Sequence, residues 1–176
     1  MNTFEEALAA FATAGEIRKK AITNLRVLNE AYEYGSSFSR GLRIELGNVV
    51  ILLISGTASI DENGETVHAG DIRGQCSRTY QNIAGLLEAE GATWKDVVRT
   101  TCYLRDIERD YAAFNEERTK FFRSEGLDPL PASTGIQAIL CRPDLLVEIE
   151  AIAMFILPGV KRPDGSGSHR NGAGGD

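Results

Sequence analysis

The most constraining feature of the sequence is a strict alternation of residue types near its end, over residues 146–156. One set of alternate positions is apolar throughout and consists of Val147, Ile149, Ala151, Ala153 and Phe155. The positions between them carry Glu148, Glu150, Ile152, Met154 and Ile156. A period of two predicts a β-strand, and the apolar set suits a core beneath helices. We therefore expect a sheet with one face covered by helices.

Glu148 and Glu150 are the first candidates for chemistry. A carboxylate among apolar neighbours is costly unless it is paired or hydrogen-bonded, and its pKa tends to rise. The alternative is that both glutamates lie on a solvent-exposed sheet face.

Length and charge exclude several classes of protein. The chain has 176 residues with 43% hydrophobic content, which fits one domain with a full core. The formal net charge of −6 argues against binding to a phosphate backbone, so a nucleic-acid partner is not expected. The only basic cluster is short, and it consists of Arg18, Lys19 and Lys20.

The cysteines and the chain start point to the cytoplasm. Three widely spaced cysteines, Cys76, Cys102 and Cys141, have no histidine partner at metal-binding spacing, so we expect reduced thiols, no metal and no cofactor. We expect no signal peptide and no membrane span, because no long apolar run occurs. The prediction is a soluble, cytoplasmic protein.

Residues 1–34 predict a helical extension. Apolar residues recur at helical spacing over residues 3–32, interrupted at Gly15, which indicates one broken helix or two short ones. This extension is either an interaction arm or a helix that packs on the domain surface. After residue 158 the composition turns to Gly, Ser, Asn and Asp, so residues 159–176 are predicted to be disordered.

Residues 35–158 predict a single α+β domain. Residues 37–46 and 49–54 form a hairpin around Gly47-Asn48, with the second strand buried on both faces. Asp71 caps a helix that ends near Gly91, a strand covers residues 98–104, and a second helix covers residues 111–124. A strand over residues 132–141 precedes the final one. The result is a mixed β-sheet with two helices on one face.

The uncovered face of this sheet predicts self-association. It carries Ile152, Met154 and Ile156 beside charged residues, which is too apolar for a bare surface. A cyclic assembly would cover it, and pockets would then form where subunits meet.

Several motifs together resemble the Rid/YjgF family, often labelled endoribonuclease L-PSP. They are residues 54–57, 94–106, 131–133 and 147–153, and the resemblance extends over residues 36–156. It implies the YjgF/chorismate-mutase-like fold and a homotrimer with ligand clefts between neighbouring subunits. It also implies a hydrolase that converts 2-imino and enamino acids to keto acids and ammonia.

The resemblance assigns site residues in part. Glu148 matches the acid that positions water and would be the catalytic general acid and base. Ser55, Gly56, Thr57 and Asn115 match or adjoin the family's pocket positions. Three positions depart from the pattern: Ser133 replaces the arginine that binds the substrate carboxylate, Phe38 replaces a tyrosine, and Gly135 replaces a cysteine.

The missing arginine matters energetically. Replacing two charge-assisted hydrogen bonds with one neutral bond costs about 2–4 kcal/mol. Arg142 either compensates from the neighbouring turn or is a surface arginine at a hairpin.

Residues 56–60 and 141–150 also resemble the C-terminal half of chorismatases, which hydrolyse chorismate to pyruvate and a hydroxylated benzoate. This resemblance implies secondary metabolism and a cyclic or enol-ether carboxylate ligand.

Four functions therefore follow as hypotheses. The first is a Rid-type enzyme acting on an imine-, enamine- or enol-derived carboxylate. The second is a non-catalytic binding or accessory protein of a biosynthetic pathway, and the third is a chorismatase-like hydrolase or lyase. The fourth is a ribonuclease, against which the negative charge and the lack of an aromatic and basic surface weigh.

Overall fold

A computed structural model describes residues 17–29 and 35–157. Its elements in chain order are β1 (Ile17–Ala21), β2 (Gly41–Leu46), β3 (Val49–Ala58), α2 (Ile72–Glu88), the short 3₁₀ helix η2 (Trp94–Asp96), β4 (Val97–Leu104), α3 (Ile107–Ser124), β5 (Ala132–Gln137) and β6 (Val147–Ile156).

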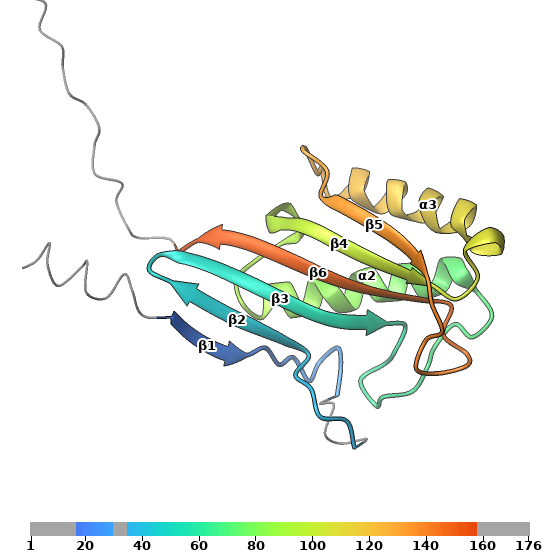
Figure 1. Cartoon of the computed structure of the whole chain (residues 1–176), viewed down its shortest axis with the longest axis horizontal. Helices are drawn as coiled ribbons and strands as arrows, with labels where there is room; N and C mark the ends of the chain where they lie inside the picture. The colour runs from blue at the N-terminus through green and yellow to red at the C-terminus, as the bar shows by residue number, and fades with distance from the viewer. Residues whose placement is uncertain (1–16, 30–34, 158–176) are drawn as a thin grey trace, which may run out of the picture.

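Six strands form one mixed sheet in the order β1-β2-β3-β6-β4-β5. Strands β4 and β5 are parallel, and every other pair is antiparallel. Both helices lie on the same side of this sheet (Figure 1). The α+β class and the mixed sheet predicted from the sequence are confirmed.

The alternation in β6 divides the two faces of the sheet. Val147, Ile149 and Ala153 are fully buried beneath the helices, whereas Met154, on the other face, is 44% exposed. We call this second face, which carries Glu148, Glu150, Ile152, Met154 and Ile156, the helix-free face.

The predicted hairpin is present, but β3 is not buried on both sides. Gly47 has a φ of +60°, which glycine adopts without strain in the two-residue turn. Val50 and Leu52 are buried, while Leu53 is 37% exposed. The prediction of burial on both faces is wrong for the single chain, because no element among residues 17–29 and 35–157 covers the helix-free face.

Pairing between β3 and β6 shifts register between Ile54 and Thr57. The shift is a bulge, and a bulge bends its strand and re-aims the neighbouring side chains. Ser55 and Gly56 occupy it, and β3 continues past the predicted end at residue 54 to Ala58, paired with β6.

The helices begin where acidic caps place them. Asp71 accepts a hydrogen bond from the Arg73 backbone N–H at 3.0 Å, which confirms the predicted cap of α2. Helix α3 begins at Ile107, earlier than predicted, because Asp106 caps it through the Arg109 N–H at 3.0 Å.

Strand β5 ends at Gln137 rather than residue 141, and Ile139 beyond it is 96% exposed.

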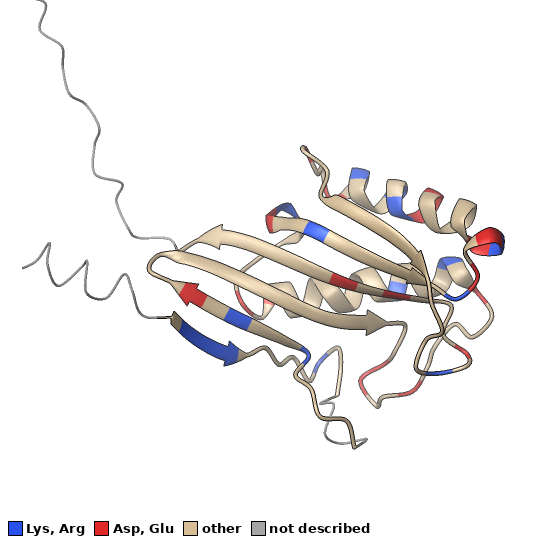
Figure 2. Ribbon diagram, viewed as in Figure 1, with Lys and Arg blue, Asp and Glu red and all other residues tan. Residues whose placement is uncertain are grey.

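The N-terminal extension is not helical where the structure describes it. Ile17–Ala21 is a strand that pairs antiparallel with β2, so the prediction of a helix there is wrong. Pairing with the open edge of β2 outweighs the local helical spacing, and Arg18 and Lys20 add ion pairs to Glu45 and Glu90. Figure 2 shows β1 as a basic edge. The rest of the predicted arm (1–16, 30–34) and the predicted tail lie outside the described residues.

Aromatic side chains join α2, α3 and η2 to one another. The Tyr80 and Phe121 rings stack with centroids 4.6 Å apart, and Trp94 meets Phe121 edge-on at 5.2 Å. In the part of the chain that the structure describes, neither helix is long and apolar enough to cross a bilayer.

Candidate functional site

Glu148 lies on β6 between two neighbouring strands. In register it is paired with Ala58 of β3 and Tyr103 of β4, and its side chain is half-buried on the helix-free face. Burial raises the pKa of Glu148, and the nearby charge of Glu150 adds to the rise. In Figure 2 the acidic segments lie in the first half of β6, and the rest of the strand is uncharged.

Gly56 provides the space for this carboxylate. The bulge brings its backbone so close to Glu148 that a Cβ at position 56 would overlap the carboxylate. Glycine is therefore required by close approach and not by an unusual φ.

A cavity of about 120 Å³ lies beside Glu148. It collects five of the predicted site residues: Phe38, Gly56, Thr57, Arg142 and Glu148. Its remaining lining residues are Leu28, Ser36, Arg40, Ala58, Ile60, Cys141 and Leu145. We call this the Glu148 cavity.

The hydroxyl groups of the bulge are engaged with the backbone. Ser55 Oγ donates to the Ser39 carbonyl oxygen at 2.7 Å, and Thr57 Oγ1 donates to the Ser55 carbonyl oxygen at 2.8 Å. These hydrogen bonds stabilise the bulge. Ser55 does not line the cavity, so its role in hydrogen bonding to a substrate stays a prediction.

Two arginines flank the Glu148 cavity. Arg142 donates from Nη1 to the Gly64 carbonyl oxygen at 2.7 Å. Arg40 is buried, donates to the Asn29 carbonyl oxygen and side chain, and lies with its guanidinium carbon 5.6 Å from the centre of the Phe38 ring. Phe38 is 43% exposed and forms an apolar wall.

The other predicted residues lie on the opposite side of the sheet. Asn115 and Ser133 line a separate cavity of about 340 Å³ between α3 and the start of β5. Gly135 is two residues further along β5, where a Cβ would be 3.7 Å from the Tyr111 ring. Ser133 shares its register position with buried Thr100, on the face that α3 covers. Within one chain, therefore, Glu148 and Ser133 do not meet.

Two further residues have the placement of site residues but were missed from the sequence. Tyr103 pairs with Glu148 in register, and burial, followed by the charge of Glu150 and a hydrogen bond to it, raises the pKa of Tyr103. The alternation over residues 98–104 already predicts that Tyr103 lies beside the glutamates, but it did not assign Tyr103 to the site. Arg118 lines the cavity of Asn115 and Ser133, and its spacing of three from Asn115 on a helix was the available signal.

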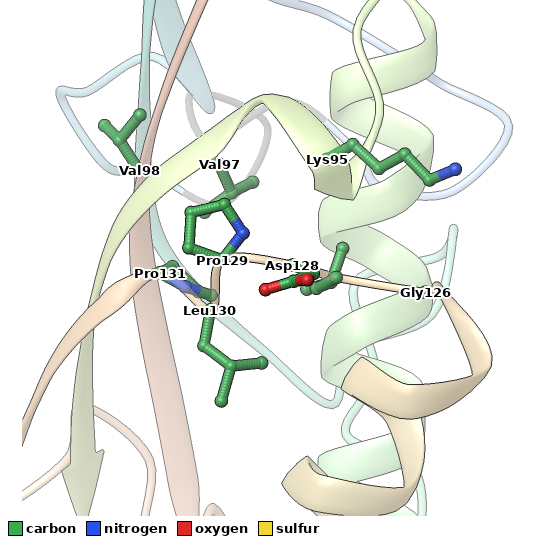
Figure 3. A pocket seen from close by; sticks show the side chains of 9 residues that line it. Lys95, Val97, Val98, Gly126, Asp128, Pro129, Leu130 and Pro131 are labelled. Atoms are coloured by element: carbon green, nitrogen blue, oxygen red, sulfur yellow. The ribbon is translucent and has the colours of Figure 1, made fainter.

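Another hollow, of about 450 Å³, lies between the start of β4 and the segment 126–131 (Figure 3). Pro129, Leu130 and Pro131 line it, with Lys95 and Asp128 as its charged residues. It contains none of the predicted site residues. Among residues 17–29 and 35–157, no group of three His, Cys, Asp or Glu side chains is placed to hold a metal ion.

The fold is that of YjgF-type proteins. The YjgF gene product from E. coli superposes with a TM-score of 0.63 at 27% identity, over 76% of this chain and 97% of that one. The Rid-family protein YyfA from Yersinia pestis gives a TM-score of 0.65 at 26% identity, over 77% of this chain and 98% of that one.

The sequence profile of the endoribonuclease L-PSP family matches residues 30–155, and the chain belongs to this family. The predicted Rid/YjgF resemblance is thereby confirmed. The 3-aminoacrylate deaminase RutC from Acinetobacter baylyi is 35% identical over 103 residues, which are 58% of this chain and 78% of that protein. A RutC family protein from Pyrococcus abyssi is 38% identical over 111 residues, 62% of this chain and 81% of the relative.

Proposed function

We propose that this protein is a Rid-type enzyme that hydrolyses an imine or enamine derived from a small carboxylic acid, in a cleft between subunits. The observation that carries the proposal is the Glu148 carboxylate, held half-buried over Gly56 with a raised pKa. The relationship to a 3-aminoacrylate deaminase supports the same reaction class.

A glutamate with a raised pKa suits both halves of such a reaction. Glu148 accepts a proton from a water molecule as the water oxygen bonds to the imine carbon. It returns this proton to the nitrogen, which gives a carbinolamine, and then carries the proton of the new hydroxyl group to the same nitrogen. The carbon–nitrogen bond breaks as the hydroxyl oxygen becomes the carbonyl oxygen, so that ammonia and a carbonyl product are released. An acid whose pKa approaches the working pH serves as both donor and acceptor. An enamine substrate would first take up a proton on carbon to become the imine.

A homotrimer would complete the site. The Glu148 cavity and the cavity of Asn115 and Ser133 lie on opposite faces of the sheet, so one molecule offers two half-sites. The helix-free face exposes Leu53, Met154 and Ile156, which a neighbouring copy would cover. We propose that the neighbour also brings its own Asn115 side of the sheet against Glu148.

Substitution of Glu148 tests the reaction. We expect Glu148→Gln to abolish ammonia release from 2-iminopropanoate and 3-aminoacrylate while leaving the assembled mass unchanged. Glu88→Gln, at the exposed end of α2, is the matched control and should retain full activity. Equal rates for Glu148→Gln and the parent protein would remove Glu148 from the mechanism.

A binding protein without catalysis is the second candidate. Phe38 lines the Glu148 cavity without a hydroxyl, and Ser133 stands where the family resemblance expects an arginine. Saturable binding of small carboxylates, with no turnover by the parent protein on imines, enol ethers or cyclic acids, would favour this candidate. The chorismatase-like activity and the cytoplasmic location stay predictions.

A further inference from the structure

We propose that Arg118, on helix α3, binds the carboxylate of the substrate. The inference rests on the proposed function, because it names the group that would hold one end of the same substrate. It also assigns a role to a residue outside the positions that the family resemblance supplies.

The Arg118 guanidinium is held in place before any ligand binds. Nη1 donates to Ser133 Oγ at 3.2 Å, and Nη2 donates to Asn115 Oδ1 at 2.6 Å. The guanidinium carbon lies 5.1 Å from the centre of the Phe114 ring, which is fully buried. A planar cation fixed in this way loses little freedom when it binds an anion.

The positive charge of Arg118 has only neutral acceptors around it. In the described part of the chain, no carboxylate lies within ion-pairing distance of this guanidinium, whereas Arg73 on α2 pairs with both Glu116 and Glu117. Charge-assisted hydrogen bonds to a carboxylate are about twice as strong as bonds between neutral groups. A carboxylate that replaces one of these neutral acceptors would therefore form a stronger hydrogen bond to Arg118 than the one it displaces.

The cavity around Arg118 suits an organic acid. It has a volume of about 340 Å³, and no acidic residue lines it. Leu127, Leu130 and Pro131 provide an apolar wall for a hydrocarbon body. Two arginines line the cavity: Arg118 lies at the side of Ser133, and Arg123 is exposed to solvent. A fully polar anion such as phosphate would leave this wall uncovered, so the features together favour a carboxylate.

The small side chain at position 133 is what admits the helix arginine. Thr100 Oγ1 donates to Ser133 Oγ at 3.0 Å, and the same Ser133 oxygen accepts from Arg118. A long side chain on β5 at this position would occupy the space that the guanidinium fills. The positive charge near position 133 thus comes from Arg118 on α3 and not from a residue of β5.

Arg142 is the competing candidate from the sequence. It lines the Glu148 cavity, on the opposite side of the sheet from Ser133, and donates to the Gly64 carbonyl oxygen. It is therefore placed near the catalytic acid and not at the position of the absent β5 arginine.

Calorimetric titration of the assembled protein tests the assignment. The probes are 2-oxobutanoate, its neutral counterpart 2-oxobutanamide, and inorganic phosphate. We expect Arg118→Met to weaken 2-oxobutanoate binding by about tenfold or more, the loss of at least one charge-assisted bond, and to leave the amide unaffected. The affinity of Arg118→Lys for 2-oxobutanoate should lie between those of the parent and Arg118→Met, because an ammonium group keeps the charge but cannot donate two parallel hydrogen bonds. Lys120→Met, on the same helix but outside this cavity, removes an equal charge and should bind as the parent does.

Several results would overturn the inference. One is unchanged 2-oxobutanoate affinity in both Arg118 variants, and another is a loss confined to Arg142→Met. Tighter binding of phosphate than of 2-oxobutanoate, or equal binding of acid and amide by the parent protein, would do the same. Circular dichroism and mass measurements confirm that the variants fold and assemble, and if Arg118→Met does not, Arg118→Lys decides. Failure of the proposed function would show separately, as a parent protein that binds the acid yet releases no ammonia from imines.

Discussion

Position 56 shows how a residue without a side chain fixes the place of the Glu148 carboxylate, the proposed catalytic group. The obstructing atoms that a Cβ would meet belong to the end of the Glu148 side chain and not to the backbone. A larger residue is therefore compatible with folding, but only if the carboxylate moves. The location of the glutamate depends on a glycine in the neighbouring strand.

We expect Gly56→Ala to lower kcat by about a hundredfold, since a displacement of roughly 1 Å in a catalytic group has an effect of that size. The free energy of unfolding should change by less than about 1 kcal/mol. Steady-state kinetics and urea titration measure the two quantities. Gly135→Ala is the steric control, because its Cβ would make only an ordinary contact with Tyr111. Full activity in Gly56→Ala would mean that the Glu148 position is not critical.

The raised pKa of Glu148 predicts a pH-dependent stability. Because the folded protein holds the Glu148 proton more tightly than the unfolded chain does, this site favours folding fully below the unfolded pKa. That contribution is lost as the pH rises through the folded pKa. The stability advantage of Glu148→Gln over the parent should therefore grow from about pH 4 to about pH 8, as followed by urea midpoints at fixed protein concentration. A difference that stays constant across this range would contradict the assignment.

At the scale of elements, helix α2 holds the end of β3 in place. The buried Asn82 side chain donates from Nδ2 to the carbonyl oxygens of Ala58 at 2.9 Å and Ile60 at 2.8 Å. Ala58 directly follows Thr57, and Ile60 lies two residues further along the chain. The helix thus stabilises the strand end from which the Glu148 cavity is built.

Asn82→Ala should lower the free energy of unfolding by about 1–3 kcal/mol, because two buried hydrogen bonds are lost. Each acceptor keeps one donor, the Ile60 N–H for the Ala58 oxygen and Arg78 Nε for the Ile60 oxygen. Urea titration measures the change, with the exposed neighbour Gln81→Ala as control. A loss no larger than that of Gln81→Ala would show that the Asn82 hydrogen bonds do not stabilise the end of β3.

Local signals in the sequence predicted most elements, and contacts distant in sequence account for the rest. The alternation in β6 and the Asp71 cap depend on residues within one element, and both are confirmed. Strand β1 was missed because an exposed edge strand needs no apolar side, and its pairing with β2 cannot be read from Ile17–Ala21 alone. The role inferred for Arg118 depends on the placement of α3 against β5, which no local pattern encodes.

At the scale of the whole molecule, the helix-free face exposes large apolar side chains that the described part of the chain leaves uncovered. Leu42 and Leu53 on neighbouring strands, and Met154 beside them, are each more than one-third exposed. Phe38, Gly56 and Glu148, which the family resemblance assigns to the site, line one cavity, whereas Ser133 lies across the sheet from them.

A charge on this face should prevent assembly. We expect Leu53→Glu to convert the proposed trimer to monomers, because an unpaired carboxylate would be buried between subunits at a cost of several kcal/mol. Light scattering after gel filtration gives the mass. Gln81→Glu, on the exposed side of α2, adds the same charge and should leave the mass unchanged. A parent protein that is already monomeric would contradict the proposed assembly.

Glu148 and Arg118 lie on opposite faces of the sheet. If each active site takes Glu148 from one subunit and Arg118 from its neighbour, a subunit that lacks one of the two residues can still complete a site with a partner that has it. Refolding equal amounts of the inactive Glu148→Gln and impaired Arg118→Met chains together should then restore part of the ammonia-releasing activity. Random association would leave roughly a quarter of the active sites with both residues intact. Each variant refolded alone provides the baseline for ammonia release. A mixture no more active than the average of the two would mean that the pair does not cooperate across subunits.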